Sequence, residues 1–288
     1  MVYLIFAVVI SYKVLSTERL SYEEIWEFDK HLNDLDDRLL ELPYSSLFME
    51  GDKNIKLHAR LFEAPVRTHK YILLNHGNSC VYTGMLKYIS VLRELGINVL
   101  APDHRGRGES GGSLNSFGYY EYRDSLKWLD KLFELDPAAQ VAVMGESMGG
   151  AISLMMGAQD DRIKLVIEDC GFYNAYDSVR FILIKKLGRL LGEMLMPLVN
   201  LFLYLASGAR LRRMDAAHAA AKMSMPLLVI HGREDTKVPV YNAFIIHKAN
   251  PSGELEIFER AEHANCIGSE RDRYINVITS FMERNGFI

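Results

Sequence analysis

The 288-residue sequence has only three cysteines, and Cys80, Cys170 and Cys266 lie far apart along the chain. An odd number of cysteines without paired spacing fits neither a disulfide framework nor a zinc site. We therefore interpret all three as small apolar core residues of a protein in a reducing compartment.

The sequence also lacks an excess of charge of either sign. It has 33 Lys and Arg against 37 Asp and Glu, a net charge of −4, and no long run of one sign. Proteins that bind nucleic acid normally carry a concentrated basic region, so we expect no nucleic-acid partner. The hydrophobic share of 49% and the charged share of 24% are those of an ordinary globular protein, which excludes extensive disorder and a polytopic membrane protein.

No uninterrupted apolar run at the N-terminus reaches the roughly 20 residues that a membrane-spanning helix needs. Residues Met1 to Ile10 are apolar, but Lys13 interrupts the segment and no charged region precedes it. The segment fits the end of a membrane anchor, an interfacial helix or a helix packed on the domain. The protein is therefore expected either in the cytoplasm or at a membrane through its N-terminus, and its oligomeric state stays open.

A helical arm is expected after this segment. Ser21 and Glu24 form the pattern of a capping box, in which each side chain binds the backbone N–H of the other residue. Apolar residues then recur at helical spacing up to Pro43, at Ile25, Phe28, Leu32, Leu35 and Leu39. We assign residues 1–43 to the apolar segment and this arm.

From residue 44 the pattern changes to strands. Two short strands, Leu47–Glu50 and Ile55–Phe62, are joined by a turn-rich segment and predict a hairpin. Nearly continuous apolar runs follow, as expected of parallel strands buried on both faces. These runs are Tyr71–Leu74, Ile97–Ala101, Val141–Met144, Leu165–Ile167, Leu227–Ile230 and the last strand Leu255–Phe258.

Helical stretches separate these runs, at 84–95, 118–134, 148–158, 240–249 and 270–284. The alternation of strands and helices predicts one α/β domain over 44–288. One connection, at about 174–222, is too long for a simple crossover and is the expected helical cap. Within it, Met194 to Ala206 carries no charge and is interpreted as a helix over an apolar pocket, or as a lid that contacts a membrane.

The sharpest motif is Gly145-Glu146-Ser147-Met148-Gly149, between a predicted buried strand and an apolar helix start. Strand, tight turn and helix are the setting of a nucleophile elbow, in which the serine is held in a strained conformation. Glycine at 145 and 149 removes the clash that side chains would make where strand and helix approach closely. Ser147 is therefore the candidate nucleophile.

A serine hydroxyl needs a base within hydrogen-bond reach, and that base is oriented by a carboxylate. His263 is the candidate base, because it lies in a short loop after the last predicted strand. Asp235, in the loop after the strand Leu227–Ile230, is the candidate acid that fixes the imidazole tautomer. Asp169, after the preceding strand, is a second position from which an acid can reach the histidine.

The other eight histidines are given structural roles. His76 and His231 precede glycines at strand ends, where packing or backbone hydrogen bonding is expected, and His104 is interpreted as structural. The remaining five are interpreted as surface or satisfied residues: His31, His58, His69, His218 and His247.

Acyl transfer also needs N–H donors for the oxyanion of the tetrahedral intermediate. Met148, which follows the nucleophile at a helix N-terminus, is one candidate. Asn78, in the loop after the strand Tyr71–Leu74, is the other. Both would act through the backbone.

Five motifs together carry a resemblance: His76-Gly77, the loop from Asp103 to Ser110, Gly145 to Gly149, Asp235 and His263. In this order the sequence resembles the serine α/β-hydrolase family over about residues 44–286, and is similar to bacterial single-domain hydrolases that are often anchored at the N-terminus. The resemblance implies an eight-stranded, mostly parallel sheet flanked by helices, with a helical cap after the sixth strand. It implies only a structural role for Asp103 and Arg105.

The predicted activity is hydrolysis of carboxylic esters by a Ser147, His263 and Asp235 triad, without a metal or an organic cofactor. The expected partner is a small-molecule ester with an apolar moiety, bound under the cap residues around Leu190 to Leu205, with Phe181 and Phe202 in the wall. A peptidase, amidase or thioesterase with the same triad is the nearest alternative. A catalytically inactive binding protein of the same fold is another.

Overall fold

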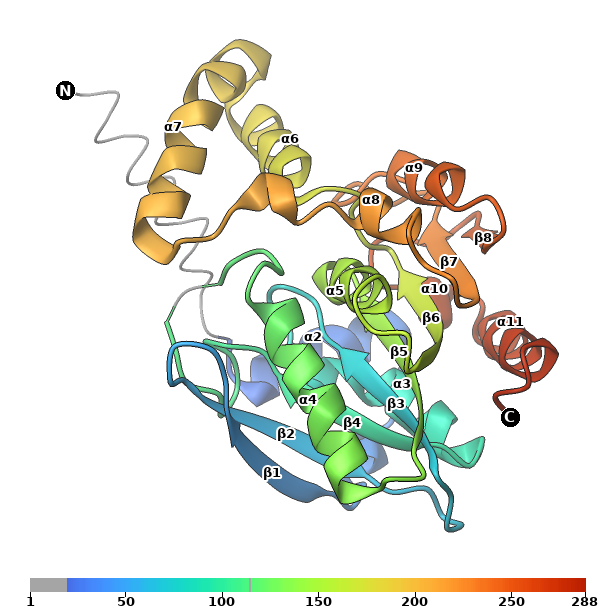
Figure 1. Cartoon of the computed structure of the whole chain (residues 1–288). Helices are drawn as coiled ribbons and strands as arrows, with labels where there is room; N and C mark the ends of the chain where they lie inside the picture. The colour runs from blue at the N-terminus through green and yellow to red at the C-terminus, as the bar shows by residue number, and fades with distance from the viewer. Residues whose placement is uncertain (1–19, 114) are drawn as a thin grey trace.

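The computed structural model describes residues 20–113 and 115–288, and one eight-stranded sheet runs through them (Figure 1). Its spatial order is β1-β2-β4-β3-β5-β6-β7-β8. The strands β3 to β8 are parallel, whereas β1 and β2 are antiparallel to their neighbours. Their bounds are β1 Ser45–Glu50, β2 Lys56–Phe62, β3 Lys70–Asn75, β4 Asn98–Asp103, β5 Gln140–Glu146, β6 Ile163–Asp169, β7 Leu227–Gly232 and β8 Glu254–Phe258. The expected mostly parallel sheet is confirmed.

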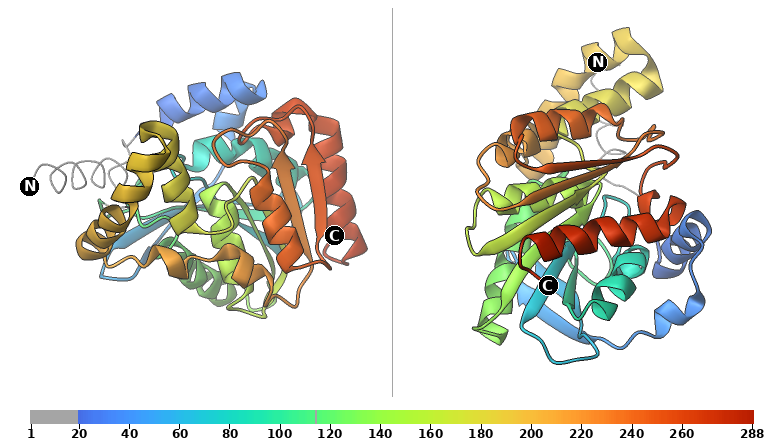
Figure 2. Two further views of the ribbon diagram at one scale, coloured as in Figure 1. Left: turned by 90° about the horizontal axis from the view of Figure 1, so that it is seen from above. Right: turned by 90° about the vertical axis from the view of Figure 1, so that its right-hand side faces the viewer.

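Helices cover both faces of this sheet (Figures 1 and 2). One face packs against α4 (Glu121–Leu135), α5 (Met148–Gly157), α8 (Ala216–Ala220) and α9 (Tyr241–Ala249). The other face packs against α2 (Tyr22–Asn33), α3 (Tyr82–Glu94), α10 (Cys266–Ser269) and α11 (Arg271–Arg284). The predicted helical stretches after residue 80 are therefore present, with ends shifted by a few residues.

Each central strand contributes side chains to two hydrophobic cores, one on each face of the sheet. In β5, Val141 and Val143 belong to one hydrophobic cluster, whereas Ala142 and Met144 belong to the other. Successive side chains of a strand point to opposite faces, so a strand buried on both faces must be apolar at every position. The continuous apolar runs in the sequence follow from this burial.

The helix of the arm starts as predicted but ends earlier than predicted. The capping box is formed, because Ser21 Oγ accepts from the Glu24 N–H at 3.1 Å and Glu24 Oε2 accepts from the Ser21 N–H at 2.7 Å. The expected continuous helix through Leu39 is wrong. α2 ends at Asn33, where Asp34 turns into the left-handed region with φ 49°, and a short 3₁₀ helix η1 (Asp37–Glu41) follows. The predictions for Met1 to Ile10 lie outside the described residues.

The long connection between β6 and β7 holds two helices that project beyond the rest of the molecule (Figures 1 and 2). They are α6 (Ala175–Leu187) and α7 (Arg189–Ser207), joined by Gly188 with φ 80°. A short 3₁₀ helix η2 (Leu211–Arg213) and α8 lead back to β7. This segment corresponds in position to the predicted cap.

Candidate active site

Ser147 lies at the turn between β5 and α5 and has a strained backbone conformation with positive φ, φ 56° and ψ −118°. A Cβ atom on Gly145 would come within 2.1 Å of the Gly149 carbonyl oxygen, and one on Gly149 within 1.9 Å of the Asn75 carbonyl oxygen. No side chain fits either position. The clash predicted from the motif is thus present, and glycine is required on both sides of the strained serine.

The structure brings Ser147, His263 and Asp235 into one hydrogen-bonded line. His263 Nε2 lies 3.0 Å from Ser147 Oγ, and His263 Nδ1 lies 2.6 Å from Asp235 Oδ2. The other oxygen of Asp235 accepts backbone N–H groups of Lys237 and Val238, both at 2.8 Å. The carboxylate is therefore fixed by its own loop, and a histidine held this way can take a proton from the serine.

The environment keeps Asp235 ionised. Burial raises its pKa, but hydrogen bonds from His231 and His263 outweigh this effect and hold the pKa well below its usual range. Asp169, the second candidate acid, is hydrogen-bonded to two buried tyrosines. Its Oδ2 accepts hydrogen bonds from the hydroxyls of Tyr88 at 3.0 Å and Tyr274 at 2.7 Å, and burial raises its pKa.

The loop that contains Asn78 lies against the elbow, since a Cβ atom on Gly77 would be 3.4 Å from Ser147 Cβ. Arg107 Nε donates to the Asn78 carbonyl at 2.9 Å, which orients this peptide from the neighbouring loop. Met148 is the first residue of α5, where backbone N–H groups have no intrahelical acceptor. Met148 thus follows Ser147 directly and Asn78 lies in the loop beside it, and Arg107 is a supporting residue that the sequence did not indicate.

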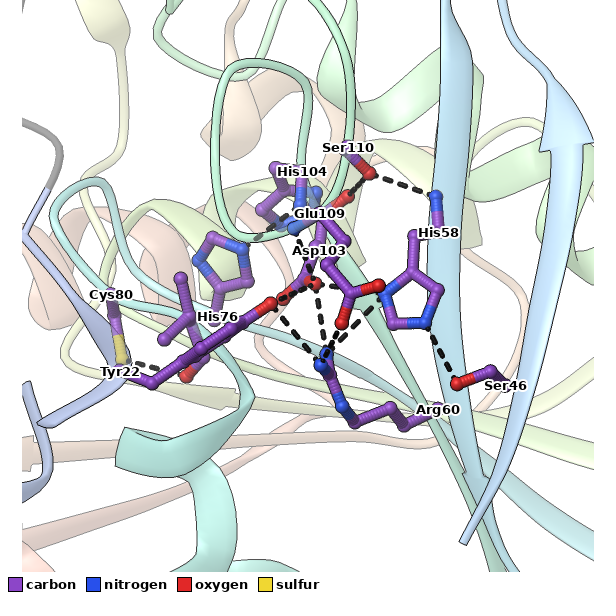
Figure 3. Close-up of polar contacts among 11 residues, drawn as sticks. Tyr22, Ser46, His58, Arg60, His76, Cys80, Asp103, His104, Glu109 and Ser110 are labelled. Carbon is purple, nitrogen blue, oxygen red and sulfur yellow. Dashed lines mark hydrogen bonds and ion pairs between the residues drawn. The ribbon is translucent and has the colours of Figure 1, made fainter.

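His76 joins this loop to the one after β4 (Figure 3). Its Nδ1 binds the Gly77 carbonyl at 2.7 Å, and its Nε2 accepts the His104 N–H at 3.0 Å. One ring nitrogen must therefore donate and the other accept, which requires the neutral form. Burial lowers the pKa of His76 to about 4, in agreement with this assignment. The structural role expected for His76 and His104 fits these contacts.

A buried polar cluster behind these loops includes a histidine that was expected at the surface or satisfied (Figure 3). His58 is satisfied but fully buried, with Nδ1 at 3.0 Å from Asp103 Oδ2. The same oxygen accepts from Arg60 at 2.9 Å and from the Tyr22 hydroxyl of the arm at 3.1 Å. Asp103 is therefore structural, as the resemblance implied, and it binds the arm to β2.

A second buried cluster lies beneath the elbow and was also missed. The ammonium of Lys87, on α3, lies 2.6 Å from Glu146 Oε2 and 2.9 Å from Asp29 Oδ1 of the arm. It also donates to the Ala264 carbonyl at 3.1 Å, directly after His263. Burial lowers the pKa of Lys87, but the two carboxylates outweigh this and raise it above its usual range. The one signal in the sequence was a lysine on an otherwise buried helix face.

A cavity of about 870 Å³ opens above Ser147 and His263. Phe181 of α6 lines this cavity as predicted, together with Ile182. The segment around Leu190 to Leu205, in α7, was also predicted to line it and does not. Phe202, the other predicted wall residue, instead packs against the hydrophobic core on the face of the sheet that α4 and α5 cover. The arm supplies the opposite part of the lining, which the sequence did not indicate; its residues there are Leu20, Ile25, Phe28 and Asp29.

Among the described residues, one group of side chains has the spacing of a metal site, namely Cys170, Asp235 and His263, whose ligand atoms lie within 4.8 Å of one another. Two of them are already bound to each other in the Ser–His–Asp arrangement. Burial raises the pKa of the Cys170 thiol well above its usual value, which disfavours the thiolate that a metal needs. We therefore assign the group to the hydrogen-bonded line described above.

Comparison with known proteins places the chain in a family. Residues 85–285 match the model of the prolyl oligopeptidase family. The chain is 32% identical to the Bacillus subtilis protein YqkD over 225 residues, which cover 76% of this chain and 73% of YqkD. It is 26% identical to YfhR of Escherichia coli O157:H7 over 218 residues, which cover 73% of this chain and 70% of YfhR.

Solved structures show the same fold. A Pyrococcus furiosus esterase aligns with a TM-score of 0.68 at 22% identity, over 87% of this chain and 94% of the esterase. A Pyrococcus horikoshii acylaminoacyl peptidase aligns with a TM-score of 0.64 at 18% identity, over 84% of this chain and 41% of the peptidase. Sheet, elbow and neighbours together define a serine α/β-hydrolase. Within that class the chain belongs to the prolyl oligopeptidase family, and it is a serine hydrolase.

Proposed function

We propose that the protein hydrolyses carboxylic esters with an apolar moiety, using Ser147, His263 and Asp235 as a catalytic triad. The observation that carries this proposal is the hydrogen-bonded line of these three side chains, of which Ser147 and His263 line the apolar cavity. Phe28, Phe181 and Ile182 give this cavity apolar walls, which suit an acyl chain or an apolar alcohol.

In the first half of the reaction, Ser147 Oγ attacks the ester carbonyl while His263 Nε2 accepts its proton. The N–H groups of Asn78 and Met148 bind the oxyanion of the tetrahedral intermediate. His263 then returns the proton to the leaving alcohol, and the acyl group stays on Ser147. In the second half, water attacks the acyl-enzyme, His263 accepts the proton of the water, and it returns this proton to Ser147 Oγ as the carboxylic acid leaves.

A peptidase is the second candidate, because the family model and one structural neighbour carry that activity in their names. An aminopeptidase that acts on unmodified peptides needs a free carboxylate to bind the N-terminal ammonium group of its substrate. Among the described residues that line the cavity, the carboxylates are Asp29 and Glu146, and both are bound to Lys87. The lining also includes the exposed Lys185 and Lys237. This balance of charge disfavours a peptide with a free N-terminal ammonium group.

Labelling with a fluorophosphonate probe tests whether Ser147 is the nucleophile. We expect wild-type protein to label and Ser147→Ala to remain unlabelled with an unchanged fold. Equal labelling of the two proteins, or no labelling of the wild type, would refute the enzyme assignment.

A panel of nitrophenyl esters of increasing acyl length, measured beside aminoacyl nitroanilides, tests the substrate class. We expect the esters to be hydrolysed faster, with a preference for chains long enough to enter the cavity. Faster cleavage of the anilides would replace the esterase proposal with the peptidase.

A further inference from the structure

Helix α7 exposes an apolar stripe that the proposed reaction does not use. Its most exposed positions repeat every three or four residues and so share one side of the helix. Leu190 is 79% exposed and Leu205 71% exposed. We define the apolar stripe as Leu190, Met194, Pro197, Leu201 and Leu205.

The opposite side of α7 is also apolar, but it is buried. Met196, Val199 and Leu203 belong to the hydrophobic core cluster that α4 and α5 share, and Leu195 is buried as well. A helix that is apolar all round is normally covered on every side, by protein or by lipid. Within the described residues, α7 is the one helix long and apolar enough to cross a membrane. Because one side is packed inward, this helix suits a position along a lipid surface and not across it.

The charge of the same segment differs from that of the remaining chain. Residues 175–213 hold two acidic side chains, Asp177 and Glu193, and Glu193 pairs with Arg180. Seven basic side chains lie in the segment: Arg180, Lys185, Lys186, Arg189, Arg210, Arg212 and Arg213. The segment thus carries +5, whereas the whole chain carries −4, so the other residues carry −9.

Two of these basic residues flank the apolar stripe, Arg189 at the start of α7 and Arg210 just after its end. In an interfacial helix, apolar side chains enter the acyl boundary while Lys and Arg reach the headgroups. Figures 1 and 2 show α6 and α7 standing out from the sheet and its flanking helices, where a flat surface can approach them.

We propose that the hairpin of α6 and α7 docks on the surface of an anionic lipid bilayer through the apolar stripe of α7. The charge complementarity selects this occupant: an anionic surface matches the basic ends of the hairpin, whereas a second copy would bring two +5 segments together. The proposal does not depend on the esterase activity.

Docking would also place the cavity beside the lipid. Phe181, Ile182 and Lys185 of α6 belong to the cavity lining, and α6 packs directly against α7. An apolar ester dissolved in the bilayer would then reach Ser147 from the hairpin side.

Co-sedimentation of the full-length protein with vesicles tests the proposal. Vesicles of phosphatidylcholine with equal parts of phosphatidylglycerol are compared with phosphatidylcholine alone. We expect binding to the anionic vesicles, weakened by added salt. The stripe variant Leu190→Gln, Leu201→Gln, Leu205→Gln should bind about tenfold more weakly. The charge variant Arg189→Gln, Arg210→Gln should lose about tenfold on anionic vesicles alone.

The matched control is Val66→Gln with Leu135→Gln, which replaces two exposed apolar residues outside the hairpin and should bind like wild type. Hydrolysis of a soluble nitrophenyl ester should stay within about twofold in every variant, because none of these residues lines the cavity. The proposal is overturned if wild-type protein does not bind anionic vesicles. It is also overturned if the stripe and charge variants bind them as well as wild type does. A wild-type dimer that the stripe variant converts to monomer assigns the stripe to a second copy and also overturns it.

Discussion

The ammonium of Lys87 lies 3.1 Å from the carbonyl oxygen of Ala264, the residue that follows His263. Ala264 has φ 61°, a conformation that costs free energy for any residue except glycine and must be held by its surroundings. The same ammonium is paired with Glu146, which precedes Ser147. One buried charge therefore contacts the chain next to both the proposed nucleophile and the proposed base.

We predict that Lys87→Met destabilises the fold by about 3 to 5 kcal/mol, because Asp29 and Glu146 are left buried without a counter-ion. Adding Asp29→Asn and Glu146→Gln removes both charges and should restore much of the stability. This neutral triple variant still lacks the donor to the Ala264 carbonyl, so its kcat should remain about tenfold below wild type with little change in KM. Denaturant unfolding and ester kinetics measure the two effects separately. Wild-type kcat in the triple variant would show that Lys87 stabilises the fold without positioning His263.

The assignment of the acid is tested by Asp235→Asn. The variant keeps an acceptor toward the loop but loses the charge that stabilises the imidazolium, so kcat should fall by a factor on the order of 10⁴. Asp169→Asn is the matched control, since Asp169 binds Tyr88 and Tyr274 instead. Its kcat should stay within about tenfold of wild type. The reverse result would transfer the role of the acid to Asp169, provided that circular dichroism shows both variants folded.

The cavity wall is tested with two phenylalanines of the cap. Phe181→Ala enlarges the cavity and should raise KM for a long acyl ester about tenfold more than for an acetate. The reason is that the long acyl chain loses its contact with the phenyl ring, whereas an acetyl group makes no such contact. Phe202→Ala should instead lower stability by about 3 kcal/mol or less without altering the chain-length preference, since Phe202 packs partly buried against the core. Equal effects of both variants on chain-length preference would contradict the lining described here.

Glu168 predicts a pH dependence of stability. It is fully buried, and burial raises its pKa from 4.5 to about 7. The folded state therefore binds the proton of Glu168 more tightly than the unfolded state does. The stability that this protonated side chain contributes is complete below about pH 4.5 and is lost as the pH rises through 7. Glu168→Gln mimics the protonated acid and should gain stability over wild type above pH 7, by a difference on the order of 3 kcal/mol. Urea unfolding at about pH 5, 7 and 9 measures this difference. A difference that does not change with pH would refute the assignment.

The strands, and the chain order of Ser147, Asp235 and His263 at their ends, could be predicted from the sequence. These depend on local signals: continuous apolar runs identify strands buried on both faces, and a candidate residue just after a run lies at the carboxyl edge of a parallel sheet. Ser147, Asp235 and His263 each follow such a run, which explains why the structure brings them together.

The contributions of the arm and the hairpin could not be predicted in the same way. Asp29 and Lys87 are 58 residues apart, and no periodic pattern relates a charge on one helix to its partner on another. In the cap, an apolar helix does not reveal which side is covered, so Phe181 and Phe202 looked equivalent. Only the packing of α6 against the cavity and of α7 against the core distinguishes them.

The position of the arm determines how this protein could be recombined with its relatives. Phe28 lines the cavity, Asp29 is a counter-ion of Lys87, and the Leu32 carbonyl accepts from Asn265 at 2.6 Å. A chimera that takes residues up to 43 from a relative and the rest from this protein would replace Phe28 in the cavity wall and Asp29, the counter-ion of Lys87, with residues of the relative. The unit that can be exchanged intact therefore begins no later than Leu20, and substitutions in the arm and in α3 should be inherited together.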